Sequence, residues 1–126
     1  MNIVRSGDYV FVPASHEDTE VPGVLKKVLL RKDAFIDGKV QMLNWALLPV
    51  GRSFSPHYHQ DMQEVFIMIQ GKATMTVDDQ EADLGPGDVV VIPPRDIHRM
   101  KNTGSEDVQY LVIGLSEGRD GKTIVI

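Results

Sequence analysis

The sequence predicts an all-β fold, either a barrel or a sandwich, and three observations predict it. Short apolar runs with strand-like alternation recur along the chain, and glycine, proline and aspartate separate them. Almost no segment has the apolar period of a helix. About ten short strands broken by such residues are typical of an all-β domain.

The predicted strands follow one another along the whole chain. They span residues 9–12, 24–30, 40–48, 57–59, 64–69, 72–77, 81–84, 89–92, 97–101, 108–115 and 122–126. The dipeptide Asp37-Gly38 is favoured in type I′ hairpin turns, because both central residues of that turn need a positive φ. Residues 14–22 are polar and acidic, so we expect an exposed loop there, with His16 as a surface or satisfied core residue.

Composition limits the class of protein. A chain of 126 residues, 42% of them hydrophobic, is expected to form one domain covering residues 1–126. A net charge of −5 disfavours binding to nucleic acid, and the absence of cysteine excludes disulfides and thiol nucleophiles. The N-terminus does not resemble a signal peptide, and no apolar run approaches the ~20 residues of a membrane span. We therefore expect a cytoplasmic protein without membrane partners.

Three of the four histidines and one glutamate have the spacing of a metal site on a β-barrel. His57 and His59 are two residues apart, so on an extended strand both side chains leave the same face. Glu64 follows a short polar loop and opens the next strand, where a hairpin would return it to the two histidines. His98 follows the apolar run 89–92 and two prolines. The spacing predicts that His57, His59, Glu64 and His98 are metal ligands.

These residues belong to a longer pattern of turn and ligand residues. The pattern resembles the first motif of the cupin superfamily at every position of that motif. The matching residues are Gly51, His57, His59, Glu64 and Gly71.

The second cupin motif is nearly complete. Gly87, Pro93, His98 and Asn102 stand at the family's offsets, but Arg95 stands where the family usually has glycine. The glycines and Pro93 are expected to form turns.

The resemblance covers residues 40–115 and implies a double-stranded β-helix, also called a jelly-roll barrel, as a single cupin domain. It also implies a divalent metal held near one mouth of the barrel by the three histidines and the glutamate. The N-terminal strands within residues 1–39 are expected to pack outside this barrel or to be exchanged between the subunits of a dimer.

The donor set limits the metal. Imidazole nitrogens and one carboxylate suit Mn, Fe, Ni, Co or Zn, whereas Ca and Mg prefer oxygen ligands. Four protein ligands would saturate tetrahedral zinc, so a catalytic site favours an octahedral metal with two open positions.

Strand alternation suggests which other side chains face the metal. Counting by twos from Glu64 places Phe66 and Met68 on its side, and counting from His98 places Met100 there. These three residues would give the substrate pocket an apolar wall.

Three further residues are candidates for the substrate pocket. Trp45 and Tyr110 lie on strands whose phase the sequence does not determine. Arg95 either projects its guanidinium at the barrel mouth, where it would hold a carboxylate or phosphate, or lies in solvent. No second carboxylate, lysine or tyrosine is evidently placed as a general base.

Cupins vary widely in function, so the fold constrains the activity weakly. We expect a metal-dependent enzyme acting on a small polar or anionic metabolite, such as a sugar derivative or carboxylic acid, by isomerase, decarboxylase or dioxygenase chemistry. The alternative is a non-catalytic module that binds a small molecule or metal, for example as a sensor.

The strand 64–69 is apolar on both faces, so its outer residues Val65, Ile67 and Ile69 need a cover. An N-terminal strand or a second subunit could supply it, and the sequence predicts a homodimer.

Overall fold

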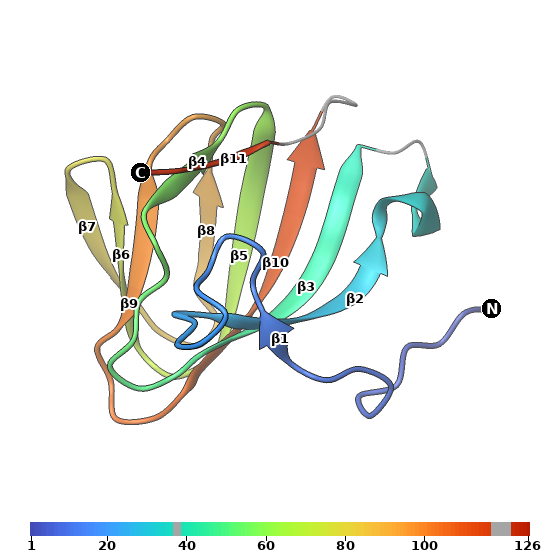
Figure 1. Ribbon diagram of the computed structural model, residues 1–126, viewed down its shortest axis with the longest axis horizontal. Helices are drawn as coiled ribbons and strands as arrows, with labels where there is room; N and C mark the ends of the chain where they lie inside the picture. Colours follow the sequence, from blue (N-terminus) through green and yellow to red (C-terminus); the bar gives the residue numbers. More distant parts are fainter. Residues whose placement is uncertain (37–38, 117–121) are drawn as a thin grey trace.

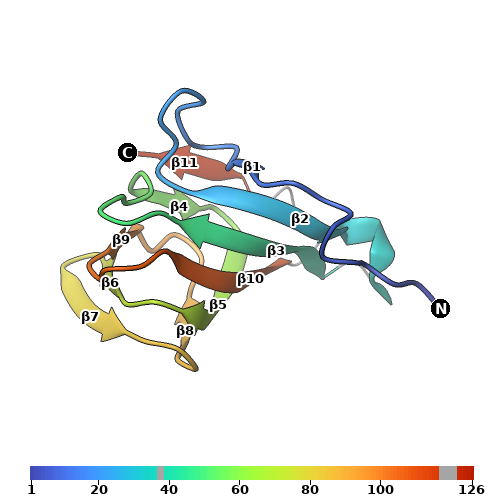
Figure 2. The same cartoon turned by 90° about the horizontal axis from the view of Figure 1, so that it is seen from below.

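The computed structural model describes residues 1–36, 39–116 and 122–126, which form two antiparallel sheets wrapped around a common interior (Figures 1 and 2). The first sheet contains, in spatial order, β1 (Val12–Pro13), β2 (Leu25–Arg31), β3 (Val40–Leu48), β10 (Val108–Ser116), β5 (Met62–Gln70) and β8 (Val89–Ile92). The second contains β11 (Thr123–Val125), β4 (His57–His59), β9 (His98–Asn102), β6 (Ala73–Val77) and β7 (Gln80–Leu84). This is the predicted double-stranded β-helix. The predicted turn at Asp37-Gly38 lies outside the described residues.

Alternation of buried and exposed side chains explains why the strands form this barrel. In β10, every second residue from Val108 to Ser116 is buried, and β5 has the same pattern over most of its length. The inward residues form an apolar core, which includes Leu48, Met75 and Val108. The short element η1 (Lys32–Ala34) is a single 3₁₀ turn with no buried residue. No helix in the described part of the chain has the length and apolarity needed to cross a bilayer.

The N-terminal strands extend the first sheet at its edge. β2 pairs with β3, and β1 pairs with β2 at only two positions, Val12 with Lys26 and Pro13 with Leu25. The first predicted strand is therefore shorter than expected, since Tyr9 and Val10 are exposed and outside any strand. Because β1 and β2 continue the sheet beyond β3, they do not cover the outer face of β5 (Figure 2).

The loop between β1 and β2 is fastened to the segment before β4. Glu17 accepts hydrogen bonds from the backbone N–H and the hydroxyl of Ser55, and Arg52 donates to the carbonyl oxygen of Pro22 at 2.9 Å. Gly23 lies so close to Ser53 that a Cβ there would overlap the Ser53 carbonyl oxygen. These contacts hold the loop against the mouth of the barrel.

Candidate metal centre

Three strands bring the four predicted ligands together. His57 and His59 point inward from β4 while Tyr58 between them does not, and His57 lies directly opposite His98 on β9. Glu64 points inward from β5. One potential ligand atom from each of the four residues lies within 4.8 Å of the others, and all four residues are buried. They form a candidate metal site.

Each histidine is oriented by an oxygen that contacts its Nδ1. His57 Nδ1 lies 2.7 Å from the Ser55 carbonyl oxygen, and His98 Nδ1 lies 3.0 Å from that of Asp96. His59 Nδ1 lies 2.9 Å from the hydroxyl of Thr123, which stands opposite it on β11. Such contacts on Nδ1 are typical of metal-binding histidines, because they fix the ring and leave Nε2 available.

The contacts of His98 leave an atom that a cation could satisfy. Its Nδ1 faces a carbonyl oxygen, which can only accept, so Nδ1 carries the hydrogen. In the neutral ring, Nε2 then has a lone pair, yet it faces Glu64 Oε1 at 3.0 Å, a second acceptor. His59 Nε2 lies 2.8 Å from the same oxygen. A proton on either group or a metal ion between the groups resolves this conflict. Two imidazole nitrogens directed at one carboxylate oxygen are also a donor set that fits a divalent transition metal.

Burial and charge favour the forms of these residues that bind metal. Burial lowers the pKa of His57 to about 3, assisted by the neighbouring His16 and His98. Burial alone would raise the pKa of Glu64, but the contacts with His59 and His98 outweigh it and hold that pKa below its usual range. A neutral imidazole and an ionised carboxylate are the ligand forms.

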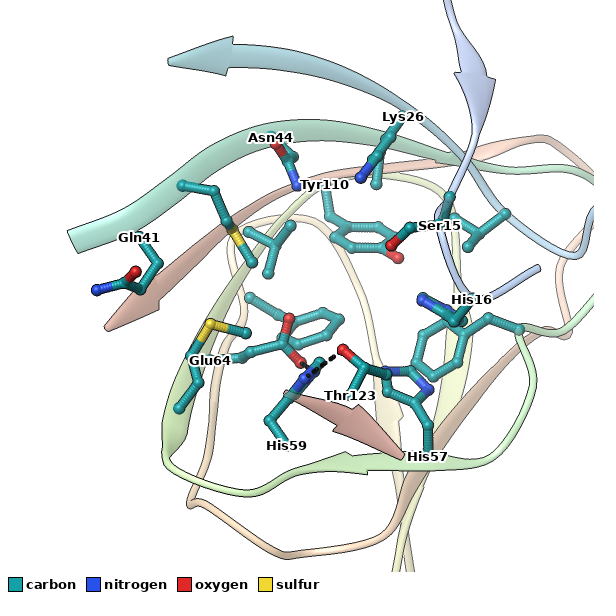
Figure 3. Close-up of a pocket in the computed structure, with 18 residues that line it drawn as sticks. Ser15, His16, Lys26, Gln41, Asn44, His57, His59, Glu64, Tyr110 and Thr123 are labelled. Carbon is teal, nitrogen blue, oxygen red and sulfur yellow. Dashed lines mark hydrogen bonds and ion pairs between the residues drawn. The ribbon is translucent and has the colours of Figure 1, made fainter. Parts of the chain in front are cut away.

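A pocket of about 300 Å³ opens beside the cluster (Figure 3). Its lining includes His57, His59 and Glu64, whereas His98 is almost fully buried and is not part of the lining. Of the residues predicted for this pocket, Phe66 and Tyr110 line it, and their rings stack with centroids 5.2 Å apart. Burial raises the pKa of Tyr110, so its phenol keeps the hydrogen at neutral pH.

Three other predicted pocket residues lie elsewhere. Met68 and Met100 have the inward orientation that alternation indicates, but they pack in the apolar core rather than along the pocket. Trp45 is on the outer face of β3, since its neighbours Asn44 and Ala46 are buried, and its Nε1 donates to Gln109 at 2.6 Å.

Arg95 also lies outside the pocket lining, and its side chain is exposed. Its backbone has φ +72°, the left-handed conformation for which glycine is better suited. The Arg95 N–H donates to the His59 carbonyl oxygen at 2.7 Å, so this turn supports the strand that carries two candidate ligands.

The polar residues that complete the pocket were not predicted. His16 is not a surface residue: its ring lies 4.1 Å from that of His57, and its Nε2 is buried without a hydrogen-bond partner. Lys26 and Asn44 line the opposite wall (Figure 3). The one available signal was Asn44 itself, a polar residue in the otherwise apolar run from Met42 to Leu48.

Comparison with known proteins agrees with this geometry. A family model described as a cupin domain matches residues 44–114, more than half of the chain. The chain is a cupin. The cupin fold is also that of a predicted oxalate decarboxylase from Thermotoga maritima, whose structure matches with a TM-score of 0.80 at 24% identity, covering 91% of this chain and 99% of that one.

Two curated relatives are enzymes with different names and activities. A quercetin 2,3-dioxygenase of Bacillus subtilis is 37% identical over 71 residues, which cover 55% of this cupin and 21% of the relative. A glucose-6-phosphate isomerase of Pyrococcus abyssi is 34% identical over 101 residues, which cover 70% of this cupin and 53% of the relative. This cupin therefore spans about half or less of their length.

Proposed function

We propose that this cupin is a metal-dependent enzyme that acts on a small polar or anionic metabolite, a sugar derivative or a carboxylic acid. One observation supports the proposal most strongly. The buried cluster of His57, His59, Glu64 and His98 borders a pocket, and polar side chains such as Lys26 and Asn44 line the opposite wall of that pocket. A barrel that had merely kept its ligands would not need hydrogen-bonding groups on the opposite wall. The dioxygenase, isomerase and decarboxylase names of the similar proteins agree with a metal-dependent enzyme but favour no single reaction.

The residues of the pocket have distinct roles in this proposal. His57, His59, Glu64 and His98 would hold Mn, Fe, Ni, Co or Zn, with the octahedral metals favoured because they keep open positions. When bound, the metal supplies Lewis acidity or an oxygen-activating centre. The protonated hydroxyl of Tyr110 can donate a hydrogen bond to a substrate oxygen, and Phe66 beneath it excludes water.

His16 stands beside this cluster and adds a further polar contact. Burial lowers its pKa, although Glu17 opposes that shift, so the ring is favoured in its neutral form. Its buried Nε2 is available to hydrogen-bond a ligand.

Turnover tests the proposal. The purified protein is loaded with each of the five metals and incubated with pools of sugars, sugar acids and small carboxylic acids, and proton NMR follows the pools. We expect conversion of at least one compound by one metal form and none by His98→Ala. Binding without conversion in every metal form would contradict an enzyme and assign the alternative, a non-catalytic binding or sensor module.

A further inference from the structure

The wall of the pocket opposite the metal cluster is built by the register of three strands. Lys26 on β2 pairs with Ala46 on β3, and Ala46 pairs with Tyr110 on β10, so these residues form one row across the sheet. Because Ala46 has a short side chain, Lys26 and Tyr110 can both extend over it into the pocket. Asn44 points inward from the next row. Figure 3 shows Lys26, Tyr110 and Asn44 together, across the pocket from Glu64 and His59.

Two of these groups have unmet hydrogen-bonding capacity. Asn44 is only 7% exposed, and its Oδ1 is buried without a partner. Lys26 is partly buried, and within residues 1–36, 39–116 and 122–126 its ammonium forms neither an ion pair nor a hydrogen bond. The buried Asn44 Oδ1 is an acceptor and does not itself bind an anion, whereas the Lys26 ammonium and the Asn44 NH₂ are donors that can bind one.

The neighbouring lysine shows that this arrangement is specific to Lys26. Lys27 points to the other face of β2, where its ammonium lies 4.7 Å from the centre of the Phe11 ring and donates to the Ser6 carbonyl oxygen. Lys26 instead lines the pocket.

Charge decides which ligand this wall would accept. A divalent cation held by neutral imidazoles and the Glu64 carboxylate leaves one net positive charge at the cluster, and Lys26 adds another across the pocket. The Glu17 carboxylate is hydrogen-bonded to Ser55 and does not line the pocket. A ligand with one negative charge at each end would neutralise both.

We propose that Lys26 and Asn44 form a carboxylate-binding subsite, and that the substrate of the proposed function is therefore a small dicarboxylate whose other end reaches the metal cluster. The ammonium and the amide NH₂ donate to the two oxygens of the second carboxylate. A single ammonium neutralises a carboxylate, which carries one negative charge, more completely than a phosphate, which carries up to two. A pocket of about 300 Å³ is large enough for a dicarboxylate of four to six carbons.

Calorimetry with a matched ligand series tests the subsite. Metal-loaded protein is titrated with succinate, glutarate and adipate, and with butyrate, valerate and hexanoate, which lack the second carboxylate. We expect at least one dicarboxylate to bind at least about tenfold more tightly than its monocarboxylate, which is the effect of one charge-assisted hydrogen bond. Lys26→Met should abolish this preference, and Asn44→Leu should reduce it.

Lys27→Met is the matched control, because it removes the adjacent ammonium from the outer face of the same strand. It should retain the preference for dicarboxylates. Lys26→Met should also leave the melting temperature of the ligand-free protein unchanged or raised, since it removes a partly buried charge.

Three results would overturn the subsite: no dicarboxylate preference in the native protein, an equal loss of preference in both methionine variants, or tighter binding of glycerol phosphate than of any dicarboxylate. Failure here is distinct from failure of the proposed function. If the protein prefers dicarboxylates but converts no compound, the subsite stands and the proposed enzymatic function is rejected. If metal-dependent turnover occurs and Lys26→Met does not affect it, the enzymatic function stands and the subsite is rejected.

Discussion

At the scale of single residues, the candidate metal centre is defined by which atoms face one another. The hydrogen on Nδ1 of His98 is determined by the Asp96 carbonyl oxygen, and this leaves Nε2 directed at Glu64. His57 has the same orientation, set by Ser55. The side chains are thus preorganised for a cation by backbone carbonyl groups, so ligand orientation depends on local chain geometry as well as on ligand identity.

The buried His57 makes the metal-free protein sensitive to acid. Its pKa is about 3 in the folded chain, against the ordinary histidine value of 6.5. Between these pH values the unfolded chain binds a proton that the folded chain does not, so stability is lost as pH falls through this range. Glu64, with its lowered pKa, adds a loss only below about pH 4.5.

We expect the free energy of unfolding of chelator-treated protein, measured with urea, to fall by about 2 kcal/mol between pH 7.5 and pH 5.0. His57→Asn keeps a donor for the Ser55 carbonyl oxygen but does not titrate, so its fall should be clearly smaller. An equal fall in native protein and variant would show that His57 does not cause it.

At the scale of elements, the sequence predicted the barrel strands and the pocket residues Phe66 and Tyr110, but not the polar residues Lys26 and Asn44. The candidate ligands lie on strands with regular alternation, so the spacing of His57, His59 and Glu64 determines their common direction. The sequence of β2 does not alternate between polar and apolar residues, so no count along the chain indicates that Lys26 points inward.

The position of the loop between β1 and β2 could not be predicted from the sequence either. Its position depends on contacts distant in sequence, such as Glu17 with Ser55, and no local pattern encodes those contacts. His16 was therefore expected to be a surface or satisfied core residue, although it borders the candidate centre. Trp45 illustrates the opposite error, because a large aromatic residue suggested the interior and the register of β3 places it outside.

Gly23 is the position where this loop is most tightly fitted. Gly23→Ala would drive a Cβ into the Ser53 carbonyl oxygen, so we expect a loss of about 1–3 kcal/mol of stability in urea unfolding. Gly7→Ala is the matched control, since an added Cβ there meets no atom within 4 Å. Equal stability of the two variants would contradict the close packing of the loop.

At the scale of the whole molecule, part of the outer face of the first sheet is exposed within the described residues, although Val65 and Ile67 are half-buried. Ile69 is 39% exposed, Val89 57% and Val91 52%, and they lie on the adjacent strands β5 and β8. The N-terminal strands extend the sheet edge and leave this face open. An apolar face of this kind favours association, and a two-fold symmetric pair would bury it against its own copy.

We therefore propose a homodimer formed through this face. Light scattering at low micromolar concentration should give about twice the 14.0 kDa chain mass. Ile67→Asp, which places a charge on the outer face of β5, should shift the protein toward monomer or insoluble material, whereas Arg99→Asp on the exposed side of β9 should not. A monodisperse native monomer would exclude this assembly.

The central claim is that His57, His59, Glu64 and His98 hold one divalent metal ion, and elemental analysis tests it most directly. Native protein, His59→Ala, His98→Ala and the control Tyr58→Phe are loaded with Mn(II) or Fe(II), desalted and analysed, with circular dichroism to verify the fold. We expect about one equivalent of metal in the native protein and the control, and loss of most of it in both alanine variants while the β spectrum persists. Undiminished stoichiometric metal in folded His59→Ala and His98→Ala would contradict the account.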